Sequence, residues 1–569
     1  MKRGVNLSGM RQEHPAWWRS WGTLLLLFLP PALAALFSRG PWGLDELRLL
    51  QVTREMASRG AWLVPTLLGE TYTHKPPLLL WLNRILLEAG LDLWISSRIL
   101  SIAAGAGTLL FFAALARRLS PQARKSPAAP LAATPFFLLM AQLGTYDMSL
   151  LFFLSAAAYT SIRNKRAWIL PGIFTGLAVL TKGPVALLFL LAWIPALRWA
   201  LWGGRALVPT RRILFFLLVA LGIVAAWFLP FCLATAGRGS WTEALFRQSL
   251  GRVSGAQGFG HPRPFWYYIP LLPLLLLPWS WTLLRGLPPT PEGQEDPWKP
   301  WEWAVLLSGL ATVFLFSCFK TKAPHYLLPL LPWFLLLLPR AQALLPPGEG
   351  RWLAWMGPPA GILLLLFGTG LLTPLLSLAG IDPGPALRPA RLPALLGGTA
   401  LLLLPLLGRR LPVEGHLALT WTLLFLAGLP LLDRFQLPYP LMKALAQDRP
   451  RRLVVVHSRY GGSLTFLAGK AGLPDSDPSA FSPGLRPFLL GLGARGVPAP
   501  ILKGPDLTRE RILLLQYLSR PGSAALLTKT YKRKLRLRDA RLPVAARGFF
   551  RGEEILLLER KAKKKESAR

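Results

Sequence analysis

Residues 212–235 read RILFFLLVALGIVAAWFLPFCLAT, an apolar run whose one charged side chain, Arg212, stands at its first position. A helix of about 20 such residues crosses a hydrocarbon core roughly 30 Å thick. The whole chain shares this character, since 52% of its 569 residues are hydrophobic and 16% are charged. Soluble globular proteins average about 25% charged residues. The sequence therefore predicts a protein that crosses a membrane several times.

Similar apolar runs recur along the chain up to residue 435. Together with the run quoted above they give about thirteen candidate spans, near residues 21–37, 95–116, 126–142, 147–163, 167–181, 183–202, 212–235, 265–285, 301–319, 325–345, 352–377, 393–411 and 415–432. We therefore expect residues 1–435 to form an all-α polytopic membrane domain. An odd number of spans places the two termini on opposite sides of the membrane.

Basic side chains gather in alternate connections between these spans, around Arg117, Arg163, Arg211 and Arg409. An excess of lysine and arginine marks cytoplasmic loops. These connections and the basic N-terminus are therefore expected inside the cell. The loops 39–94 and 236–264, and the chain after residue 435, are then expected on the outer side.

The region after residue 435 has a different pattern, with short apolar runs between polar segments. Three runs are typical of strands and two segments of helices: residues 452–457, 524–528 and 554–559, and residues 439–447 and 507–519. We expect residues 436–559 to form a small extracytoplasmic α/β domain. Residues 560–569 are so highly charged that we expect a disordered basic tail. The basic region suits either solubilising charge or contact with anionic lipid or polysaccharide.

The net charge is strongly positive, because 65 lysines and arginines face 27 aspartates and glutamates, a balance of +38. In a soluble protein this would suggest a nucleic-acid partner. Basic loops at a membrane explain the charge, and no zinc-finger spacing or RNA-binding motif accompanies it. We expect no nucleic-acid partner. Cys232 and Cys318 stand far apart, and neither a disulfide nor a cysteine metal site is expected.

The first outer loop contains two adjacent carboxylates, Asp45 and Glu46, and Arg48 follows three residues after Asp45. Residues three apart lie on one face of a helix. Carboxylates and a guanidinium at a membrane surface suit a site that handles hydroxyls and phosphates. The alternative is an interfacial amphipathic helix whose charges are simply solvated.

More ionisable side chains fall on the same outer face of the thirteen-span arrangement: Lys75, Asp147, Lys182, Lys322 and His325. An acid at the mouth of a span is costly to bury and is a functional candidate. A lone lysine such as Lys182 can snorkel to the interface. The gathering of all these residues on one face favours a functional site over solvated charge.

The residues also resemble a known family. Its motifs occur here in the family's order: Asp45-Glu-Leu-Arg48, Tyr72-Thr-His-Lys75-Pro-Pro77, Tyr146-Asp147-Met-Ser-Leu, Leu180-Thr-Lys182-Gly-Pro184, His261-Pro-Arg-Pro-Phe-Trp-Tyr-Tyr268 and Lys322-Ala-Pro-His325-Tyr326. The set is similar to that of the aminoarabinose transferases, which are membrane glycosyltransferases of the C-type fold. These enzymes are related to the dolichyl-phosphate-mannose–protein mannosyltransferases. The resemblance covers roughly residues 20–435.

The resemblance implies an enzyme that takes a sugar from a polyprenyl phosphate, typically undecaprenyl phosphate, and passes it to an acceptor outside the membrane. It implies Asp45 and Asp147 as catalytic carboxylates, with Asp45 orienting the acceptor or taking its proton. Cations would stabilise the departing lipid phosphate. The residues expected to bind the lipid phosphate or the sugar are Glu46, Arg48, Tyr72, Lys75, Lys182, Arg247, Arg252, Lys322, His325 and Tyr326.

One position departs from the family, because His74 stands where the family usually has Glu. In some members that acid joins a histidine in holding a metal, and His261 matches the histidine. His74 and His261 could therefore hold a divalent metal, Zn or Mg/Mn, since imidazole is a competent ligand. A plain polar contact is the alternative.

The sequence thus predicts an integral-membrane glycosyltransferase that moves a pentose or hexose from undecaprenyl phosphate to lipid A or another cell-envelope glycan. A protein O-mannosyltransferase-like enzyme with a polypeptide acceptor is one alternative. A lipid-linked sugar flippase or transporter is another, although transporters place ionisable residues near mid-membrane and often show repeated halves. We expect a multi-pass protein of the bacterial inner membrane with its active site on the periplasmic face.

Overall fold

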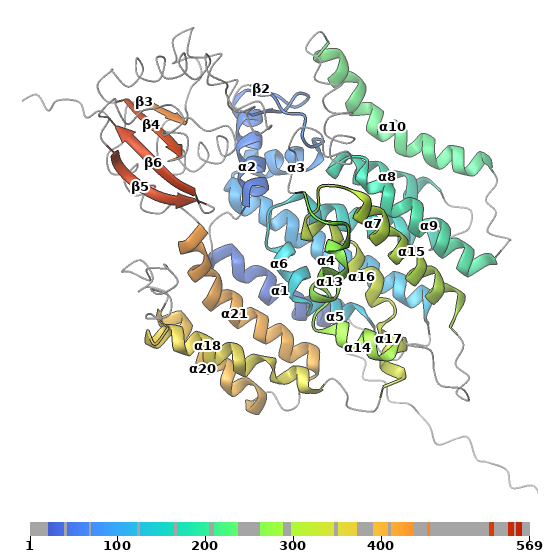
Figure 1. Ribbon diagram of the computed structural model, residues 1–569. Helices are drawn as coiled ribbons and strands as arrows, with labels where there is room; N and C mark the ends of the chain where they lie inside the picture. Colours follow the sequence, from blue (N-terminus) through green and yellow to red (C-terminus); the bar gives the residue numbers. More distant parts are fainter. Residues whose placement is uncertain are drawn as a thin grey trace, which may run out of the picture.

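The computed structural model describes residues 21–38, 43–67, 70–121, 126–163, 168–203, 210–236, 262–287, 298–345, 351–372, 391–407 and 411–436, and four strands beyond them. Helices make up most of the described chain (Figure 1). The first half contains α1 (Trp21–Ser38), α2 (Gly43–Ser58), α3 (Leu78–Glu88), α4 (Leu93–Leu119), α5 (Ala128–Ala132), α6 (Pro135–Ala141), α7 (Tyr146–Arg163), α8 (Ile169–Lys182), α9 (Val185–Trp202) and α10 (Thr210–Ala234). The connection between α2 and α3 holds a short hairpin of β1 (Thr66–Leu67) and β2 (Glu70–Thr71).

The second half of the helical region has shorter and more broken helices. They are η6 (Phe265–Tyr267), α13 (Tyr268–Leu275), α14 (Trp279–Gly286), α15 (Pro300–Cys318), η7 (Pro324–Leu327), α16 (Leu330–Leu335), α17 (Leu338–Ala343), η8 (Arg351–Met356), α18 (Gly357–Thr369), α20 (Arg391–Leu407) and α21 (Val413–Gln436). The elements follow the apolar runs of the sequence, because a backbone in lipid must satisfy its hydrogen bonds within the segment.

Three runs predicted as single spans contain breaks. The run 126–142 forms α5 and α6, and α6 meets α7 at 112°. The run 265–285 bends by 106° between α13 and α14, around Pro278. The run 325–345 forms η7, α16 and α17. Prolines lack the amide that a continuous helix needs, and they are common in these runs.

Among the described residues, four helices are long and apolar enough to cross a membrane, and six spans result if each bent pair counts as one. Six shorter apolar helices of 10–17 residues accompany them. The protein is therefore a helical membrane protein, and the count of thirteen spans stays a prediction.

The core of the bundle is packed with aromatic rings. Trp193 of α9 stacks on Trp333 of α16 with ring centroids 4.1 Å apart, and Phe189 lies 5.0 Å from Phe316 of α15. Helices α4, α7 and α8 pack side by side within the same core. These contacts fix the relative positions of the helix ends that carry the charged residues.

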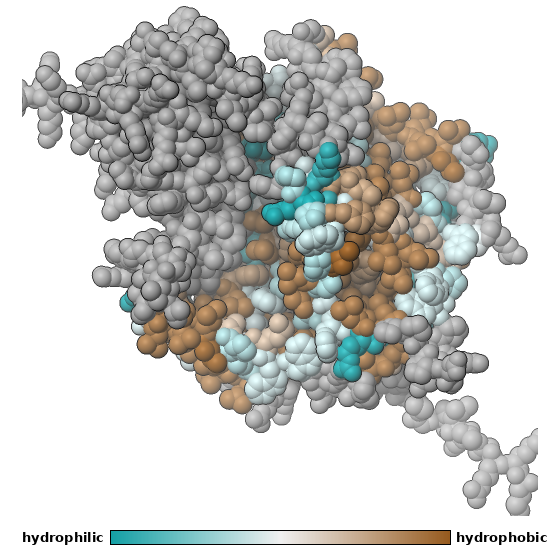
Figure 2. Space-filling model, in the orientation of Figure 1, coloured by the Kyte–Doolittle hydropathy of each residue, from teal (hydrophilic) through white to brown (hydrophobic). Residues whose placement is uncertain are grey.

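Large apolar side chains cover the outside of α10, α15, α18 and α20. Figure 2 shows this surface in brown over the right and lower left of the molecule. Leu218, Leu221 and Leu233 of α10 are all well exposed. Exposed apolar surfaces of this extent suit contact with lipid rather than water.

Four strands belong to the C-terminal region: β3 (Arg452–Val455), β4 (Ser523–Thr528), β5 (Val544–Phe550) and β6 (Glu553–Glu559). They form one sheet in the order β3-β4-β6-β5, with β3 parallel to β4 and the other pairs antiparallel. Three strands lie where the sequence predicts them, and β5 was not predicted. The predicted helices 439–447 and 507–519 and the predicted tail 560–569 lie outside the described residues. The sheet lies at the same end of the molecule as α2 (Figure 1).

Candidate functional site

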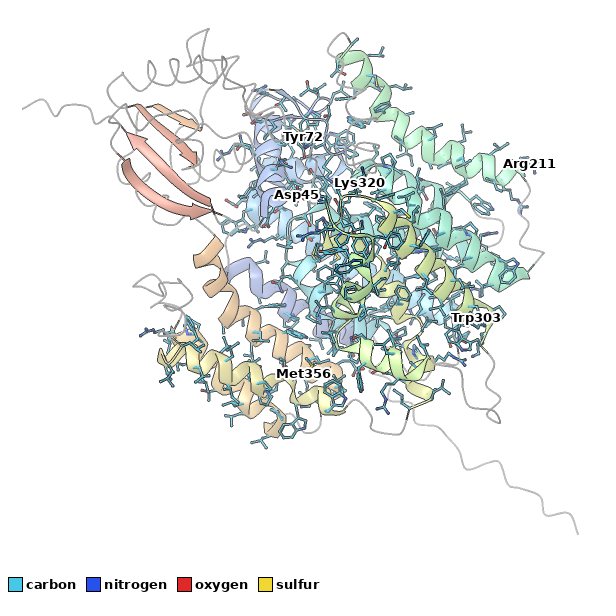
Figure 3. All side chains as sticks on the ribbon, viewed as in Figure 1. Asp45, Tyr72, Arg211, Trp303, Lys320 and Met356 are labelled. Carbon is cyan, nitrogen blue, oxygen red and sulfur yellow. The ribbon has the colours of Figure 1, made fainter. Side chains whose placement is uncertain are left out.

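Charged side chains from five separate elements converge at one end of the bundle. The elements are α2, the segment after the β1–β2 hairpin, the start of α7, the end of α8, and η7. Asp45, Asp147, Lys75 and Lys182 all lie close enough to the His325 imidazole for their charges to influence its pKa. In Figure 3, Asp45 and Tyr72 lie toward this end of the bundle, and Trp303 and Met356 lie toward the other. The sequence prediction that these ionisable residues share one face is consistent with this arrangement.

Helix α2 presents Asp45 and Arg48 on one face. Its first turn contains two acidic residues, and their negative charge interacts favourably with the positive N-terminal end of the helix dipole. The Arg48 guanidinium lies 3.5 Å from the Asp45 carboxylate, and their side chains are 24% and 51% exposed. An ion pair this open contributes little to stability. Both groups are therefore accessible to a ligand.

The segment after the hairpin brings Tyr72, His74 and Lys75 to the same region. The Tyr72 amide donates a hydrogen bond to the Pro65 carbonyl at 2.8 Å, which fixes the chain as it leaves β2. The rings of Tyr72 and His74 lie 5.2 Å apart. Lys75 is buried, and its ammonium lies 5.7 Å from the centre of the Tyr146 ring.

A buried ion pair joins α7 to α8. The Lys182 ammonium donates to the Asp147 carboxylate, and the hydroxyl of Thr145 donates to the other carboxylate oxygen at 3.3 Å. The side chains of Lys182 and Asp147 are only 7% and 10% exposed. The Lys182 ammonium also lies 5.2 Å from the centre of the Tyr326 ring. Burial makes such a pair sensitive to the loss of either partner.

His325 stands in η7, between α15 and α16, with its ring 4.8 Å from that of Tyr326 and nearly perpendicular to it. Burial lowers the pKa of His325 below its usual value of 6.5, and the nearby Asp147 carboxylate partly opposes this effect. The imidazole is therefore neutral at neutral pH. A neutral imidazole can both donate and accept a hydrogen bond.

Lys322 has a different environment from the other predicted lysines. Its ammonium donates to the backbone carbonyl of Arg263 at 3.1 Å and to that of Phe319. A backbone bridge between Pro262 and Thr321 lies beside it. Lys322 thus fastens the connection after α15 to the chain that enters η6.

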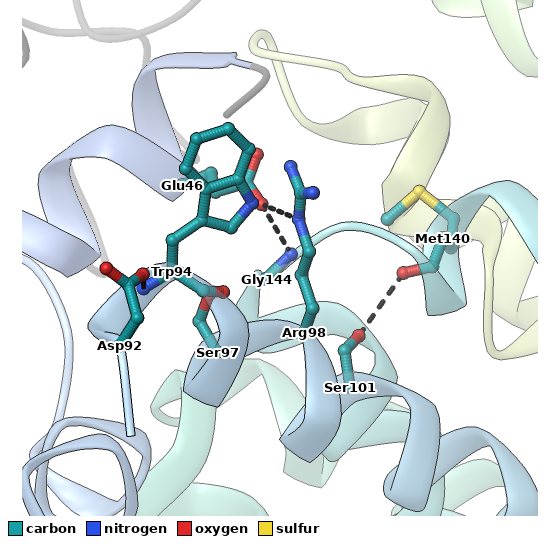
Figure 4. Close-up of polar contacts among 8 residues, drawn as sticks. All are labelled: Glu46, Asp92, Trp94, Ser97, Arg98, Ser101, Met140 and Gly144. Atoms are coloured by element: carbon teal, nitrogen blue, oxygen red, sulfur yellow. Dashed lines mark hydrogen bonds and ion pairs between the residues drawn. The ribbon is translucent and has the colours of Figure 1, made fainter. Parts of the chain in front are cut away.

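Glu46 also lies apart from the exposed face of α2. Its side chain is fully buried and contacts Arg98 and the backbone amide of Gly144 (Figure 4). Arg98, Gly144 and Tyr146 were not predicted as site residues. The sequence could have indicated Arg98, because it is a charged side chain inside the apolar run 95–116.

Three predicted residues, Arg247, Arg252 and His261, lie outside the described residues. Within the described ranges no group of three or more His, Cys, Asp or Glu side chains could hold a metal. The pairing of His74 with His261 therefore stays a prediction.

The arrangement combines an open carboxylate–guanidinium pair with buried cations and a neutral imidazole. Cations close together in a partly buried site can bind a phosphate and stabilise charge that develops on it. A carboxylate that reaches solvent can orient a hydroxyl or accept its proton. The site therefore has the parts needed for group transfer from a phosphate.

Comparison with known proteins gives matches to one group. Residues 74–231 match the family described as dolichyl-phosphate-mannose-protein mannosyltransferase. The chain is 31% identical over 333 residues to the undecaprenyl phosphate-alpha-4-amino-4-deoxy-L-arabinose arabinosyl transferase of Pseudomonas paraeruginosa, which covers 56% of this chain and 59% of that protein. It is 29% identical over 342 residues to the enzyme of the same name from Serratia proteamaculans, covering 56% and 58%. The chain thus spans less than two thirds of the length of these relatives.

The fold matches over nearly the whole chain. The crystal structure of ArnT from Cupriavidus metallidurans bound to undecaprenyl phosphate superposes with a TM-score of 0.66 at 20% identity, covering 95% of this chain and 98% of that one. Its apo structure gives a TM-score of 0.62. At this identity the likeness shows the fold. The resemblance to aminoarabinose transferases and their mannosyltransferase relatives is thereby confirmed.

Proposed function

We propose that this chain, which shares the fold of ArnT, is a glycosyltransferase that uses a polyprenyl-phosphate sugar, with undecaprenyl phosphate as the carrier. The observation that carries the proposal is the convergence of Asp45, Lys75, Asp147, Lys182 and His325 at one end of this fold. The similarity to enzymes named as arabinosyl transferases that use undecaprenyl phosphate supports the donor. The proposed acceptor is lipid A or another cell-envelope glycan.

The proposed reaction breaks the bond between the anomeric carbon of the sugar and an oxygen of the lipid phosphate. The electron pair of that bond goes to the departing phosphate, and an oxygen of the acceptor forms the new bond to the anomeric carbon. Arg48 lies 3.5 Å from Asp45, and the Lys75 ammonium lies 5.7 Å from the centre of the Tyr146 ring. Their positive charges are proposed to stabilise the negative charge on the departing phosphate. Asp45 orients the acceptor and takes its proton when that oxygen is a hydroxyl.

Asp147 has a second role in the proposal. Its ion pair with Lys182 neutralises it, so it orients the site or the sugar through its oxygens rather than acting as the first base. His325 and Tyr326 lie beside this pair, and Tyr72 lies beside Tyr146, the residue before Asp147. All three are proposed to contact the sugar. Arg247 and Arg252 remain proposed phosphate ligands. His74 and His261 remain proposed ligands of a divalent metal.

The proposed location is the bacterial inner membrane, with the site and the C-terminal domain on the periplasmic side. The basic connections around Arg117, Arg163 and Arg211 support this orientation, because they lie at the opposite ends of their helices from Asp147 and Lys182. The apolar surface of α10, α15, α18 and α20 supports contact with the bilayer.

The test is donor turnover by the purified full chain in detergent. A panel of undecaprenyl-phosphate pentoses and hexoses is offered with lipid A, and released undecaprenyl phosphate is followed by mass spectrometry. We expect release that requires the acceptor, and a loss of about 100-fold or more in Asp45→Asn. Glu88→Gln is the matched control, because Glu88 is a half-exposed carboxylate on α3 that pairs with Arg84.

Absence of release with every donor would contradict the proposal. If lipid-linked sugar then crosses vesicles that contain the protein, the chain is a transporter.

The acceptor has a second candidate. The match of residues 74–231 to the protein mannosyltransferase family favours a polypeptide acceptor. A peptide rich in serine and threonine, offered in place of lipid A, separates the two. Transfer to the peptide alone would identify a protein glycosyltransferase.

A further inference from the structure

The turn between α6 and α7 interrupts a membrane helix, since the two axes meet at 112°. Backbone groups freed by such a break must find partners within the protein. The hydroxyl of Ser101 on α4 donates to the Met140 carbonyl at 3.3 Å. The side-chain amide of Gln142 donates to the Pro31 carbonyl of α1 at 2.8 Å. Neighbouring helices therefore hold the turn at both of these points.

A third contact ties the turn to α2. The Gly144 amide donates to Glu46 Oε1 at 3.0 Å, and Arg98 Nε lies 3.4 Å from the same oxygen (Figure 4). The side chains of Glu46 and Arg98 are both 0% exposed. Arg98 also lies 4.6 Å from the centre of the Trp94 ring. One carboxylate oxygen thus joins three elements, α2, α4 and the α6–α7 turn.

Close backbone approach makes this contact possible. A Cβ at residue 144 would lie 2.7 Å from the Cβ of Ser97 and 3.2 Å from Glu46 Oε1. Such contacts are shorter than side chains tolerate, so only glycine lets the turn reach both Ser97 and the carboxylate.

The contact of Glu46 with Arg98 and Gly144, called the joint below, connects α2 to the turn that leads into α7. These two helices carry the proposed catalytic carboxylates. Asp45 directly precedes Glu46 on α2, and Asp147 follows Gly144 by three residues. The hydroxyl of Thr145, next to Gly144, donates to Asp147 at 3.3 Å. We infer that Glu46, with Arg98 and Gly144, is a positioning unit that sets the spacing between Asp45 and Asp147, and that Glu46 does not itself bind substrate. Its catalytic consequence rests on the proposed function, whereas the joint is a property of the fold.

Two variants test the unit. Glu46→Gln keeps the shape of the side chain and an oxygen that can accept the Gly144 amide, but removes the charge. The pair Glu46→Leu with Arg98→Met removes both members of this buried ion pair together, which spares folding the cost of removing one member alone. The rate of hydrogen–deuterium exchange in the peptide 140–147 reports whether the Gly144 amide is still hydrogen-bonded. Turnover and the affinity for undecaprenyl phosphate are measured on the same samples.

We expect the double variant to fold and to exchange the Gly144 amide about tenfold faster than the original protein. Its kcat should fall by about 10- to 100-fold, because small misplacements of reacting groups are costly. Its affinity for undecaprenyl phosphate should stay within about threefold, since no phosphate ligand is removed. Glu46→Gln should show a smaller effect of the same kind.

Glu55→Gln is the control for exchange. Glu55 is another buried carboxylate of α2, and it accepts hydrogen bonds from Gln51 and Thr66. Exchange of the peptide 140–147 should be unchanged in this variant.

Unchanged exchange of residues 140–147 in the double variant would overturn the inference. A weaker affinity for undecaprenyl phosphate without faster exchange would also overturn it and make Glu46 a ligand. If the double variant exchanges faster but keeps its full kcat, the joint contributes to stability and not to catalysis. That result would also overturn the inference. Should the original protein show no turnover, the proposed function fails, and exchange alone still decides whether the joint exists.

Discussion

At His325 two opposing influences set the charge of the imidazole. Burial lowers its pKa below 6.5, while Asp147 and Asp45 raise it and Lys182 and Lys75 lower it further. The net pKa is lowered, so the folded protein binds this proton less readily than the unfolded chain. Stability from the neutral imidazole is present above the ordinary pKa and is lost as the pH falls toward the folded pKa.

Acidification should therefore lower the thermal unfolding midpoint through this residue. Between pH about 7 and about 5, the midpoint in detergent should fall more steeply in the original protein than in His325→Asn, which has no group that titrates there. Parallel pH profiles for the two proteins would contradict the lowered pKa.

The Asp147–Lys182 pair gives a second prediction at this scale. Lys182→Met leaves Asp147 as an unpaired carboxylate in a buried site, which costs about 3–5 kcal/mol of stability. Adding Asp147→Leu should restore much of the thermal midpoint, because the carboxylate that lost its Lys182 partner is then removed as well. Lys320→Met is the control, since Lys320 is an exposed lysine nearby. If the double variant is no more stable than Lys182→Met, the unpaired Asp147 carboxylate is not the cause of the lost stability.

Sequence reasoning found most of the residues that converge, because charges at the ends of apolar runs are visible in one dimension. The sequence placed Glu46 in the predicted site together with Asp45. Adjacent residues on a helix point about 100° apart, so Asp45 faces the site and Glu46 faces the interior. The sequence also grouped Lys322 with His325, whereas the lysine bonds with backbone carbonyls. Gly144 gave no signal, because its need for close approach depends on Ser97.

At the scale of elements, α10 is attached to the bundle mainly through α8. Gly172 and Gly176 of α8 stand one turn apart on the face toward α10. A Cβ at residue 176 would lie 2.9 Å from the Cβ of Ile223 and 3.0 Å from the Ala220 carbonyl. Small residues at such spacing let two membrane helices pack closely.

Gly176→Leu should therefore weaken this helix pair by about 1–3 kcal/mol, since the added side chain has no space. The thermal midpoint in detergent measures the effect. Gly222→Leu is the matched control on α10, because no atom lies within 4 Å of a Cβ there. Equal midpoints for the two variants would contradict the close packing of α8 and α10.

Apolar runs predicted the helices well wherever the helix is unbroken. The run 147–163 is α7 (Tyr146–Arg163), and the run 301–319 is α15 (Pro300–Cys318). The bends were not predicted, because hydropathy reports how apolar a segment is and not its direction. The bend before α7 depends on partners from α1, α2 and α4, which are distant in sequence.

At the scale of the whole molecule, the charged cluster and the basic helix ends lie at opposite ends of the same helices. Helix α7 begins beside Asp147 and ends at Arg163, and α4 ends at Arg117 and Arg118. By the positive-inside rule we therefore propose that the cluster lies outside the cytoplasm. The same end carries α2 and the C-terminal sheet (Figure 1).

Labelling of single cysteines tests this orientation. In a background in which Cys232 and Cys318 are replaced by serine, Lys320→Cys should react with a membrane-impermeant maleimide in intact spheroplasts. Arg118→Cys, an exposed site on the last turn of α4, should react only after lysis. The reverse pattern would place the site in the cytoplasm.

The most direct test of the central claim is acceptor-dependent release of undecaprenyl phosphate from an undecaprenyl-phosphate sugar by the purified chain. The account predicts release together with a sugar-modified acceptor, nearly abolished in Asp45→Asn and retained in Glu88→Gln. Equal release by the Asp45→Asn variant, or no release with any donor, would contradict it.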